Sequence, residues 1–386
     1  MDRLTTKDKR QMTHGGKARH VVIDARIRRS STGRYIDRLL EHLQDVDKDT
    51  SYTVLLQPDD PWQPRGSNFT VVPCKYAQFS LNPADQFGFA RQLYKLKADL
   101  VHFPMNQQPL LYFKPVITTV MDFTFLRFPR NNGSSKPIFL LKMSAYRFLF
   151  KHAIKKSKAI ITITDYVKNE LEQTYGFTKG KITTTLCASE PPIKDAAVQP
   201  KGVVNNDKYL FAVGSAFPHK NLQNLVLAHK ILLTKYPDLK LFMAGKKEYY
   251  YNQLDTYIEQ NTNTNMVRTL GFVTDAELKW LYQHTSVYVF PSFSEGFGLP
   301  ALEAMVHGVP VASSNATCLP EVCGNAANYF NPNSPADIAK AIEEILNSQK
   351  LRQDLVKKGH EQVKKFSWQR MATQTLQVYE SVVDSL

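Results

Sequence analysis

Two glutamates separated by seven residues, Glu295 and Glu303, say most about the chemistry of this chain. They enclose a Gly-Phe-Gly turn that starts at Gly296, ends at Gly298 and is followed closely by Pro300. Glycine permits unusual backbone dihedral angles and a close approach to a ligand, and proline fits the start of a helix. An ionised carboxylate only accepts hydrogen bonds, so both side chains suit the hydroxyl groups of a sugar.

The elements around these glutamates must present them at a strand-to-helix turn. Residues 286–291 predict an apolar strand, and the residues after Gly298 predict a helix. A helix N-terminus has free N–H groups and partial positive charge, which favour a pyrophosphate, whereas carboxylates repel one and must face uncharged groups. Two glutamates alone are also typical of the start of a helix, where they stabilise its dipole. Combined with the glycines, the proline and the preceding strand, the pair indicates a site for a nucleotide-linked sugar.

A second strand-to-helix turn carries a cation. Gly214 ends an apolar strand, and Lys220 comes just before a helical segment. A lysine there can neutralise the β-phosphate of a nucleotide sugar as the diphosphate departs. His219 either assists the lysine or is an ordinary solvent-exposed histidine. Gly33, after the first predicted strand, either brings the backbone close to a ligand or forms an ordinary turn, and Arg34 beside it contacts phosphate or is solvated.

The segment 295–303 resembles the E-x7-E motif of retaining GT-B glycosyltransferases, in particular glycosyltransferase family four, the glycosyl transferases of group 1. Other segments are similar to further motifs of that family: 214–222, 271–278, 319–324 and 366–369 in the second half, and more loosely 31–35, 99–102 and 160–164 in the first. The resemblance covers residues 20–385 and is tight only in the second half.

The resemblance implies an α/β protein with the GT-B fold, in which two doubly wound Rossmann-like domains face each other across a cleft and a C-terminal helix returns to the first domain. It implies a retaining hexosyltransferase that needs no metal ion. No cofactor is expected either, because the GDP- or UDP-linked sugar is a substrate. The first domain would bind a glycan or lipid-linked acceptor. In this scheme Glu295 contacts donor-sugar hydroxyls, Glu303 binds the ribose and Lys220 stabilises the diphosphate.

The predicted site residues fall into two sets. Catalytic roles are expected for Glu295, Lys220 and Asp122. Donor contacts are expected from Gly33, Gly214, Ser215, His219, Lys220, Phe272, Val273, Glu295, Gly296, Phe297, Gly298, Leu299 and Glu303.

Several positions depart from the family pattern. Met121 stands where the family usually has histidine, and Ser215 and His219 stand where it often has arginine. Asp122 either orients a sugar or acceptor hydroxyl or caps a helix, and His102 is a further candidate better explained as structural. These departures keep a second hypothesis open, namely a GT-B protein that does not transfer sugar, such as a nucleotide-sugar epimerase or a degenerate sugar-binding module.

Charge is unevenly distributed along the 386 residues, whose net charge is +14. Residues 1–190 carry 30 lysines and arginines against 17 acidic residues, a net charge of +13, whereas the remainder carries 19 against 18. The positive net charge of the first half predicts that it binds an anionic partner. The aromatic, lysine-rich segment 135–158 predicts either a helix that lies on an anionic bilayer or a packing helix with a charged outer face. Nucleic acid is disfavoured because no nucleic-acid-binding motif is visible.

Composition places the chain among cytoplasmic proteins, with peripheral binding at the inner membrane face as an option. Hydrophobic residues make up 43%, enough for full cores, and no apolar run reaches the ~18 residues that span a bilayer. The four cysteines are scattered and predict reduced thiols. Asp45 and Asp47 form a D-x-D pattern that metal-binding transferases use, but the charged run around them favours a solvated loop.

Alternation of apolar strands with amphipathic helices predicts the domain organisation. A disordered tail is expected over 1–19, a Rossmann-like acceptor domain over 20–190, a linker over 191–207, a nucleotide-sugar domain over 208–365 and a helix packing on the first domain over 366–386. Strands are predicted at 20–24, 52–56, 99–103, 116–120 and 159–163, and then at 208–213, 240–244, 267–270, 287–290 and 309–312.

Overall fold

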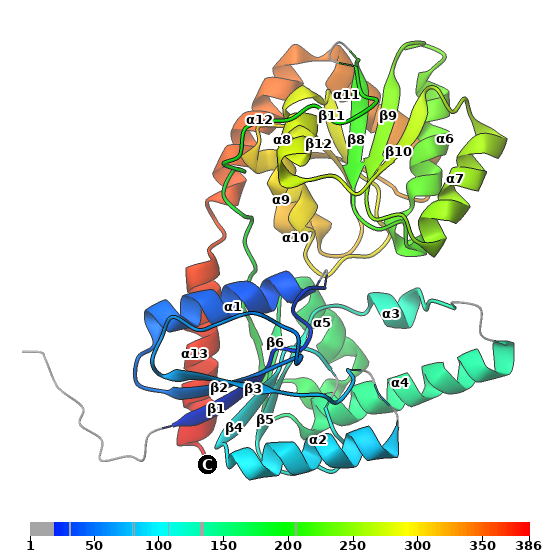
Figure 1. Cartoon of the computed structure of the whole chain (residues 1–386). Coiled ribbons are helices and arrows are strands. Elements are labelled where there is room, and N and C mark those ends of the chain that lie inside the picture. The colour runs from blue at the N-terminus through cyan, green and yellow to red at the C-terminus, as the bar shows by residue number, and fades with distance from the viewer. Residues whose placement is uncertain are drawn as a thin grey trace, which may run out of the picture.

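The computed structural model describes residues 19–386 except 31, 79, 81, 107, 132–134 and 205–206. Within this part of the chain two parallel sheets form two domains, one above the other in Figure 1. The first sheet has the order β3-β2-β1-β4-β5-β6-β7 and the second the order β10-β9-β8-β11-β12-β13. The predicted α/β class with two doubly wound domains is confirmed.

The first domain contains β1 (His20–Asp24), α1 (Gly33–Val46), β2 (Ser51–Leu56), β3 (Phe69–Pro73), α2 (Pro83–Leu96), β4 (Leu100–Phe103), β5 (Val116–Val120), α3 (Thr124–Arg127), α4 (Lys136–Lys156), β6 (Ala159–Thr162), α5 (Asp165–Thr174), η1 (Gly176–Thr178) and β7 (Ile182–Thr184). The second contains β8 (Tyr209–Val213), η2 (Pro218–Lys220), α6 (Leu222–Leu232), β9 (Lys240–Ala244), α7 (Tyr249–Asn261), β10 (Val267–Gly271), α8 (Asp275–His284), β11 (Val287–Phe290), α9 (Leu299–Val306), β12 (Val311–Ser314), α10 (Leu319–Cys323), β13 (Ala327–Phe330), α11 (Pro335–Asn347) and α12 (Gln349–Val363). The last helix is α13 (Trp368–Asp384).

The central strands are buried on both faces, which explains their continuous apolar runs. On β1, Val21 and Ile23 join the core that contains α1 and α13, whereas Val22 joins the core under α2. On β8, Phe211 and Ala212 likewise face opposite layers of helices. Because both sheets are parallel, the carboxyl ends of all strands in a domain lie at one edge, where ligand sites form.

Helix α13 ties the end of the chain back to the first domain, as predicted (Figure 1). The hydroxyl of Tyr379 lies 2.6 Å from Nδ1 of the fully buried His102, whose Nε2 lies 2.8 Å from Oγ1 of Thr119. Burial lowers the pKa of His102 to about 3, so its ring is neutral, and the prediction of a structural role for this histidine is confirmed.

The predicted tail over 1–19 includes one residue that the structure describes, Arg19. Arg19 pairs with Glu380 and Asp384 on α13, at 3.1 and 2.7 Å. Residues 1–18 lie outside the described residues.

Edge strands and exact boundaries differ from the sequence prediction. Strand β12 begins at Val311, two residues after the predicted start, and strands β3, β7 and β13 were not predicted. The D-x-D segment is not a solvated loop, because Asp47 is buried and accepts hydrogen bonds from Tyr52 and from the backbone of Asp49 and Thr50. The predicted linker 191–207 contains neither helix nor strand in its described residues.

Replacing Tyr379 with phenylalanine is expected to lower the free energy of unfolding by about 1–3 kcal/mol, because it leaves a buried nitrogen of His102 without a partner. Urea-induced unfolding at neutral pH measures the loss. The matched control is Tyr249→Phe, which removes a hydroxyl from an exposed tyrosine. Equal stability of the two variants would contradict the role given to the Tyr379 hydroxyl.

Candidate active site

The loop after β8 places a lysine at the carboxyl edge of the second sheet. Gly214 adopts a φ of 139°, which favours glycine, and its carbonyl accepts a hydrogen bond from Tyr251 at 2.8 Å. Asn221, just after Lys220, donates to the carbonyls of Pro291 and Pro332 at 2.9 and 2.7 Å. These bonds hold both ends of the loop, so Lys220 projects from a fixed backbone.

The loop between β11 and α9 brings Glu295 to that lysine. Oε1 of Glu295 accepts hydrogen bonds from Nζ of Lys220 at 2.7 Å and from Oγ of Ser292 at 2.6 Å. The backbone N–H of Glu295 donates to Oγ1 of Thr317 at 3.1 Å. The glutamate is therefore oriented before any ligand arrives.

A hollow of about 260 Å³ lies beside this pair at the carboxyl ends of β8 and β11. Its lining includes Gly214, Ser215, Lys220, Tyr251, Phe290 and Ser292. The predicted donor residues Gly214, Ser215 and Lys220 thus share one cavity.

Asp122 approaches from the first domain, where it follows β5. Its Oδ1 accepts a hydrogen bond from the backbone N–H of Thr124 at 2.7 Å, a local bond made two residues along the chain, whereas the N-cap position of α3 is Phe123. Burial raises the pKa of Asp122, the negative charge of Glu295 raises it further, and Thr124 and Lys220 oppose the shift. The three predicted catalytic residues therefore interact electrostatically across the two domains.

Gly296 lies in close contact with the first domain. A Cβ atom there would lie 2.3 Å from the carbonyl oxygen of Met121 and 3.0 Å from Cβ of Asp122. Oγ1 of Thr164, the N-cap of α5, donates to the Gly296 carbonyl at 3.1 Å. The absence of a side chain at Gly296 thus serves contact with the first domain in this structure.

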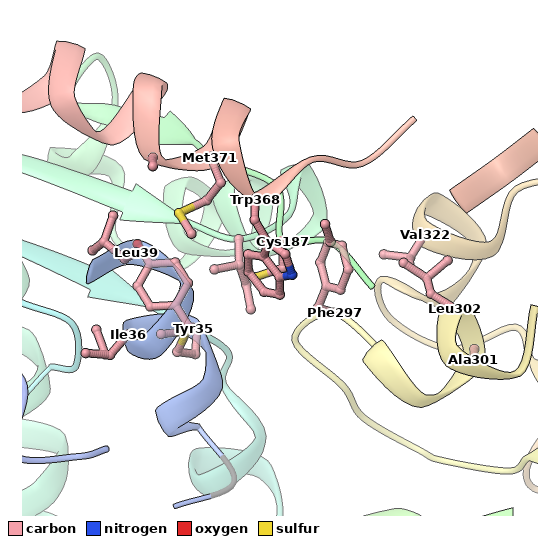
Figure 2. Close-up of a cluster of buried hydrophobic side chains, with 14 of the residues drawn as sticks. Tyr35, Ile36, Leu39, Cys187, Phe297, Ala301, Leu302, Val322, Trp368 and Met371 are labelled. Carbon is pink, nitrogen blue, oxygen red and sulfur yellow. The ribbon is translucent and has the colours of Figure 1, made fainter. Parts of the chain in front are cut away.

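Further contacts across the boundary hold the domains together. Both carboxylate oxygens of Glu321 accept backbone N–H groups of α5, from Asp165 and Tyr166, at 2.8 Å each. Figure 2 shows the neighbouring apolar cluster, in which Phe297 of the second domain lies between Trp368 and Leu302. The ring of Phe297 also meets Phe366 edge-on at 5.5 Å. One continuous core therefore spans the two domains.

Glu303, on α9, pairs with Arg34 at the start of α1. Arg34, whose side chain is 42% exposed, thus bridges to the opposite domain in this structure. The hydroxyls of Tyr282 and Tyr288 are buried without partners within the described residues. Burial raises the pKa of both phenols, and the charge of Glu303 adds to the shift. Glu303 thus sits in a mainly apolar surrounding with one cationic partner.

His219 is buried rather than solvent-exposed, which overturns one of its two predicted environments. Burial, together with the charges of Lys220 and Arg130, lowers its pKa to about 3. Its Nδ1 has no hydrogen-bond partner within the part of the chain that the structure describes. A neutral ring cannot supply the positive charge that a phosphate needs.

The remaining predicted donor residues lie at the same edge of the second sheet or at the start of α1. Phe272 follows β10 and is 78% exposed, with Val273 next to it. Gly298 is the N-cap of α9 at a φ of 101°, and Leu299 is the first residue of that helix. A Cβ atom on Gly33 would lie 2.9 Å from the backbone of Arg28, so this glycine also serves packing within its own loop.

A larger hollow of about 580 Å³ lies in the first domain at the carboxyl ends of β1 and β4. At its wall Arg26 and Asp24 form a buried ion pair, and Arg26 also lies 3.9 Å above the ring of Phe89. Gln108 and Leu149, the latter on α4, line the hollow too. This cavity places polar and apolar groups together in the first domain.

Sequence reasoning missed the residues that join the domains, namely Arg34, Thr164 and Glu321. The segments around them had been noticed, but which residue faces the other domain depends on how the domains pack. No cluster of three or more His, Cys, Asp or Glu side chains suited to a metal occurs among the described residues. Among the helices that the structure describes, none is long and apolar enough to cross a membrane.

Comparison with known proteins gives two family matches. Residues 194–362 match the family described as glycosyl transferases group 1, and residues 32–187 match glycosyltransferase family 4. O-antigen chain mannosyltransferase B from Escherichia coli is 31% identical over 274 residues, which cover 68% of this chain and 70% of that protein. O-antigen chain mannosyltransferase RfbU from Salmonella typhimurium is 30% identical over 200 residues, and the match spans about half of each, 52% and 54%.

Solved structures share the fold. Sucrose-phosphate synthase from Thermosynechococcus elongatus has a TM-score of 0.74 at 16% identity, covering 95% of this chain and all of that one. WaaG, a glycosyltransferase involved in lipopolysaccharide biosynthesis, has a TM-score of 0.70 at 14% identity, covering 92% and 98%.

Replacing Gly296 with alanine is expected to open the domains, because the new methyl group would collide with the Met121 carbonyl. Small-angle X-ray scattering should show a larger radius of gyration than for the unchanged protein, with thermal unfolding little affected. The control is Gly176→Ala, where a Cβ atom meets nothing within 4 Å. An unchanged scattering curve for Gly296→Ala would contradict this account of closure.

Proposed function

This chain belongs to the glycosyl transferases of group 1, and from that premise we propose that it moves a hexose, specifically mannose, from a nucleoside-diphosphate sugar to a glycan or lipid-linked acceptor. The names of two relatives, both O-antigen chain mannosyltransferases, support mannose as the sugar and polysaccharide assembly as the setting. A mannosyl donor is expected to be GDP-linked, with UDP-linked hexoses as the competing choice.

The observation that carries the proposal is the ion pair between Lys220 and Glu295 at a strand-end cavity, opposite Asp122 of the first domain. In this scheme Lys220 faces the departing diphosphate and Glu295 accepts hydrogen bonds from donor-sugar hydroxyls. Binding of the donor would loosen the ion pair, because each partner then gains a ligand of its own. A preformed pair lets both groups stay charged in a poorly solvated site before the donor binds.

The nucleoside end of the donor is proposed to lie between α9 and β10. Glu303 would accept the ribose hydroxyls, which places the base near Phe272 and Val273. Arg34 holds Glu303 in the unliganded arrangement, and its half-exposed side chain can move aside at little cost.

Transfer is proposed to retain the configuration of the anomeric carbon. The bond from that carbon to the diphosphate oxygen breaks, and its electron pair leaves with the diphosphate. The acceptor oxygen then bonds to the carbon on the same face, while its proton passes to an oxygen of the departing phosphate. Asp122 is proposed to orient a sugar or acceptor hydroxyl, and burial raises the pKa of this carboxyl.

The acceptor is proposed to enter through the 580 Å³ hollow of the first domain. Its buried Asp24–Arg26 pair offers polar contacts for a sugar, and Phe89 and Leu149 offer apolar ones. A glycan carried on a lipid would suit a cavity whose wall includes α4.

We further propose that α4 docks the enzyme on an anionic bilayer at the cytoplasmic face of a membrane. Its side chains Ile138, Leu140, Leu141 and Phe148 are all more than half exposed, and the exposed Arg147, Lys151 and Lys155 lie on the same helix. These residues are here called the α4 surface. In Figure 1 the helix projects beyond the sheet. Exposed apolar side chains interleaved with basic ones are the pattern of an interfacial helix.

Two rival functions make different predictions. A non-transferring GT-B protein would bind a nucleotide without forming a glycosidic bond. A nucleic-acid-binding protein would be retained on nucleic acid in a salt-dependent way without binding nucleotide sugars.

With EDTA present, calorimetry is expected to show binding of one nucleotide among GDP, UDP and ADP, and its hexose conjugate should support transfer. Glu303→Gln should weaken that binding about tenfold, which is about 1.4 kcal/mol. Glu295→Gln and Lys220→Ala should each lower transfer about 100-fold, because each removes a charge that stabilises the transition state. NMR of the product should show a retained anomeric configuration.

The matched control is Glu343→Gln, which breaks a Lys–Glu pair with the same 2.7 Å separation on the outside of the second domain. Binding without transfer or hydrolysis of any donor would favour the non-transferring alternative. Activity lost in EDTA and restored by a divalent cation would contradict metal independence.

The double substitution Leu141→Ser with Phe148→Ser is expected to reduce co-sedimentation with phosphatidylglycerol-containing vesicles at least tenfold, since it removes two exposed apolar anchors. Neutral phosphatidylcholine vesicles should bind the unchanged protein weakly. Ile231→Ser, at an exposed apolar residue of the second domain, is the control. Undiminished binding of the double variant would rule out the α4 surface as the docking site.

A further inference from the structure

The cavity expected to hold the donor diphosphate is short of free positive charge. His219 is neutral, because burial lowers its pKa to about 3. Lys220 is already paired with Glu295 at 2.7 Å. A diphosphate that gains negative charge as it departs normally meets more than one cation or a metal ion.

Arg130, a residue of the first domain, brings a cation to the loop between Gly214 and Lys220. It follows α3 in the first domain, yet its guanidinium carbon lies 3.4 Å above the ring of Phe217, in the loop that leads from Gly214 to Lys220. Such a distance is a stacking contact, which fixes the plane of the guanidinium group and leaves its edge N–H groups for hydrogen bonding.

Aromatic contacts hold both sides of this stack. Phe217 meets the ring of Tyr250 edge-on at 5.5 Å and stacks with His219 at 5.9 Å. Phe128, two residues before Arg130, stacks on Phe293 of the second domain at 6.0 Å. The segment that carries Arg130 is thus applied to the phosphate-side loop by several rings.

The guanidinium group itself lacks an anionic partner. No carboxylate forms an ion pair with Arg130 among the described residues, and its Nε is buried there without a hydrogen-bond partner. Burial lowers the pKa of Arg130, and the nearest acidic groups that oppose the shift are Tyr250 and Asp122. Arginine stays protonated in proteins, so this half-buried guanidinium group carries a charge that an incoming anion would satisfy.

We propose that Arg130 binds an oxygen of the donor's β-phosphate when the domains are closed, which makes it a catalytic residue supplied by the first domain. This inference rests on the proposed function. The shared chemistry is a phosphate oxyanion, whose source is the donor or a phosphorylated acceptor. The donor is favoured because Phe217 lies on the loop that also carries Gly214 and Lys220 at the 260 Å³ hollow.

The consequence is that leaving-group stabilisation depends on domain closure. When the bond between the sugar and the diphosphate breaks, the electron pair moves onto the phosphate oxygen that Lys220 and Arg130 face. A cation that reaches this oxygen only in the closed arrangement acts more strongly on the transition state than on the bound donor. Closure would therefore raise the rate of transfer, and an open enzyme would hold its donor without cleaving it.

The test compares Arg130→Gln and Arg130→Lys with Arg127→Gln, which changes a nearby arginine that pairs with Glu170. Arg130→Gln should lower kcat about 100-fold and weaken competition by inorganic pyrophosphate, and by the preferred nucleoside diphosphate, about tenfold. Affinity for the matching nucleoside monophosphate should not change. Arg130→Lys should recover part of kcat, because it keeps the charge but loses the planar fork, and Arg127→Gln should behave like the unchanged protein.

The outcomes separate this inference from the function on which it rests. If the unchanged protein binds no nucleotide, the proposed function fails and takes the inference with it. If that protein transfers sugar and Arg130→Gln does so equally well, the role of Arg130 alone is overturned. A rise confined to the KM of the acceptor, with pyrophosphate competition intact, would assign the oxyanion to the acceptor and also overturn the proposal. Thermal unfolding of each variant shows that it is folded.

Discussion

The contact between Gly296 and the carbonyl of Met121 is the constraint on which the arrangement of the site depends. Any side chain at Gly296 would occupy space that the first domain already fills. Because the domains meet there, Asp122 comes within electrostatic range of Glu295 and Lys220, although it belongs to a different sheet. The departure from the family pattern at Met121 fits this picture, since that position contributes a backbone carbonyl to the domain contact whatever its side chain.

Closure also explains how charge is distributed in the cleft. Two cations near the domain boundary form ion pairs with carboxylates. Lys220 pairs with Glu295, and Arg34 pairs with Glu303. Arg130 differs because it is stacked on an aromatic ring rather than paired with a carboxylate. Partial burial makes an uncompensated charge costly, so a guanidinium in this position favours an arrangement in which an anion completes it.

Much of the fold could be predicted from the sequence, because strands buried on both faces have apolar runs that differ sharply from the helices between them. Strand β3 was missed because it is a half-exposed edge strand, and β12 was placed two residues early because Val309 continues the apolar run without pairing. The sequence could not show that Glu303 pairs with Arg34 or that Glu321 accepts hydrogen bonds from α5. The two members of these contacts are 269 and 156 residues apart, and only the relative orientation of the domains decides which groups meet.

The ion pair between Glu303 and Arg34 connects the contact between the domains with the proposed nucleotide site. Glu303 is mostly buried among Tyr282, Tyr288 and the first domain, so leaving it unpaired would cost free energy. Arg34 remains 42% exposed, which lets it exchange the carboxylate for water at little cost. The ion pair thus orients the carboxylate without binding it tightly. In the proposed scheme a ribose with two hydroxyls would replace the guanidinium, so that the domain contact and the nucleotide would share one carboxylate.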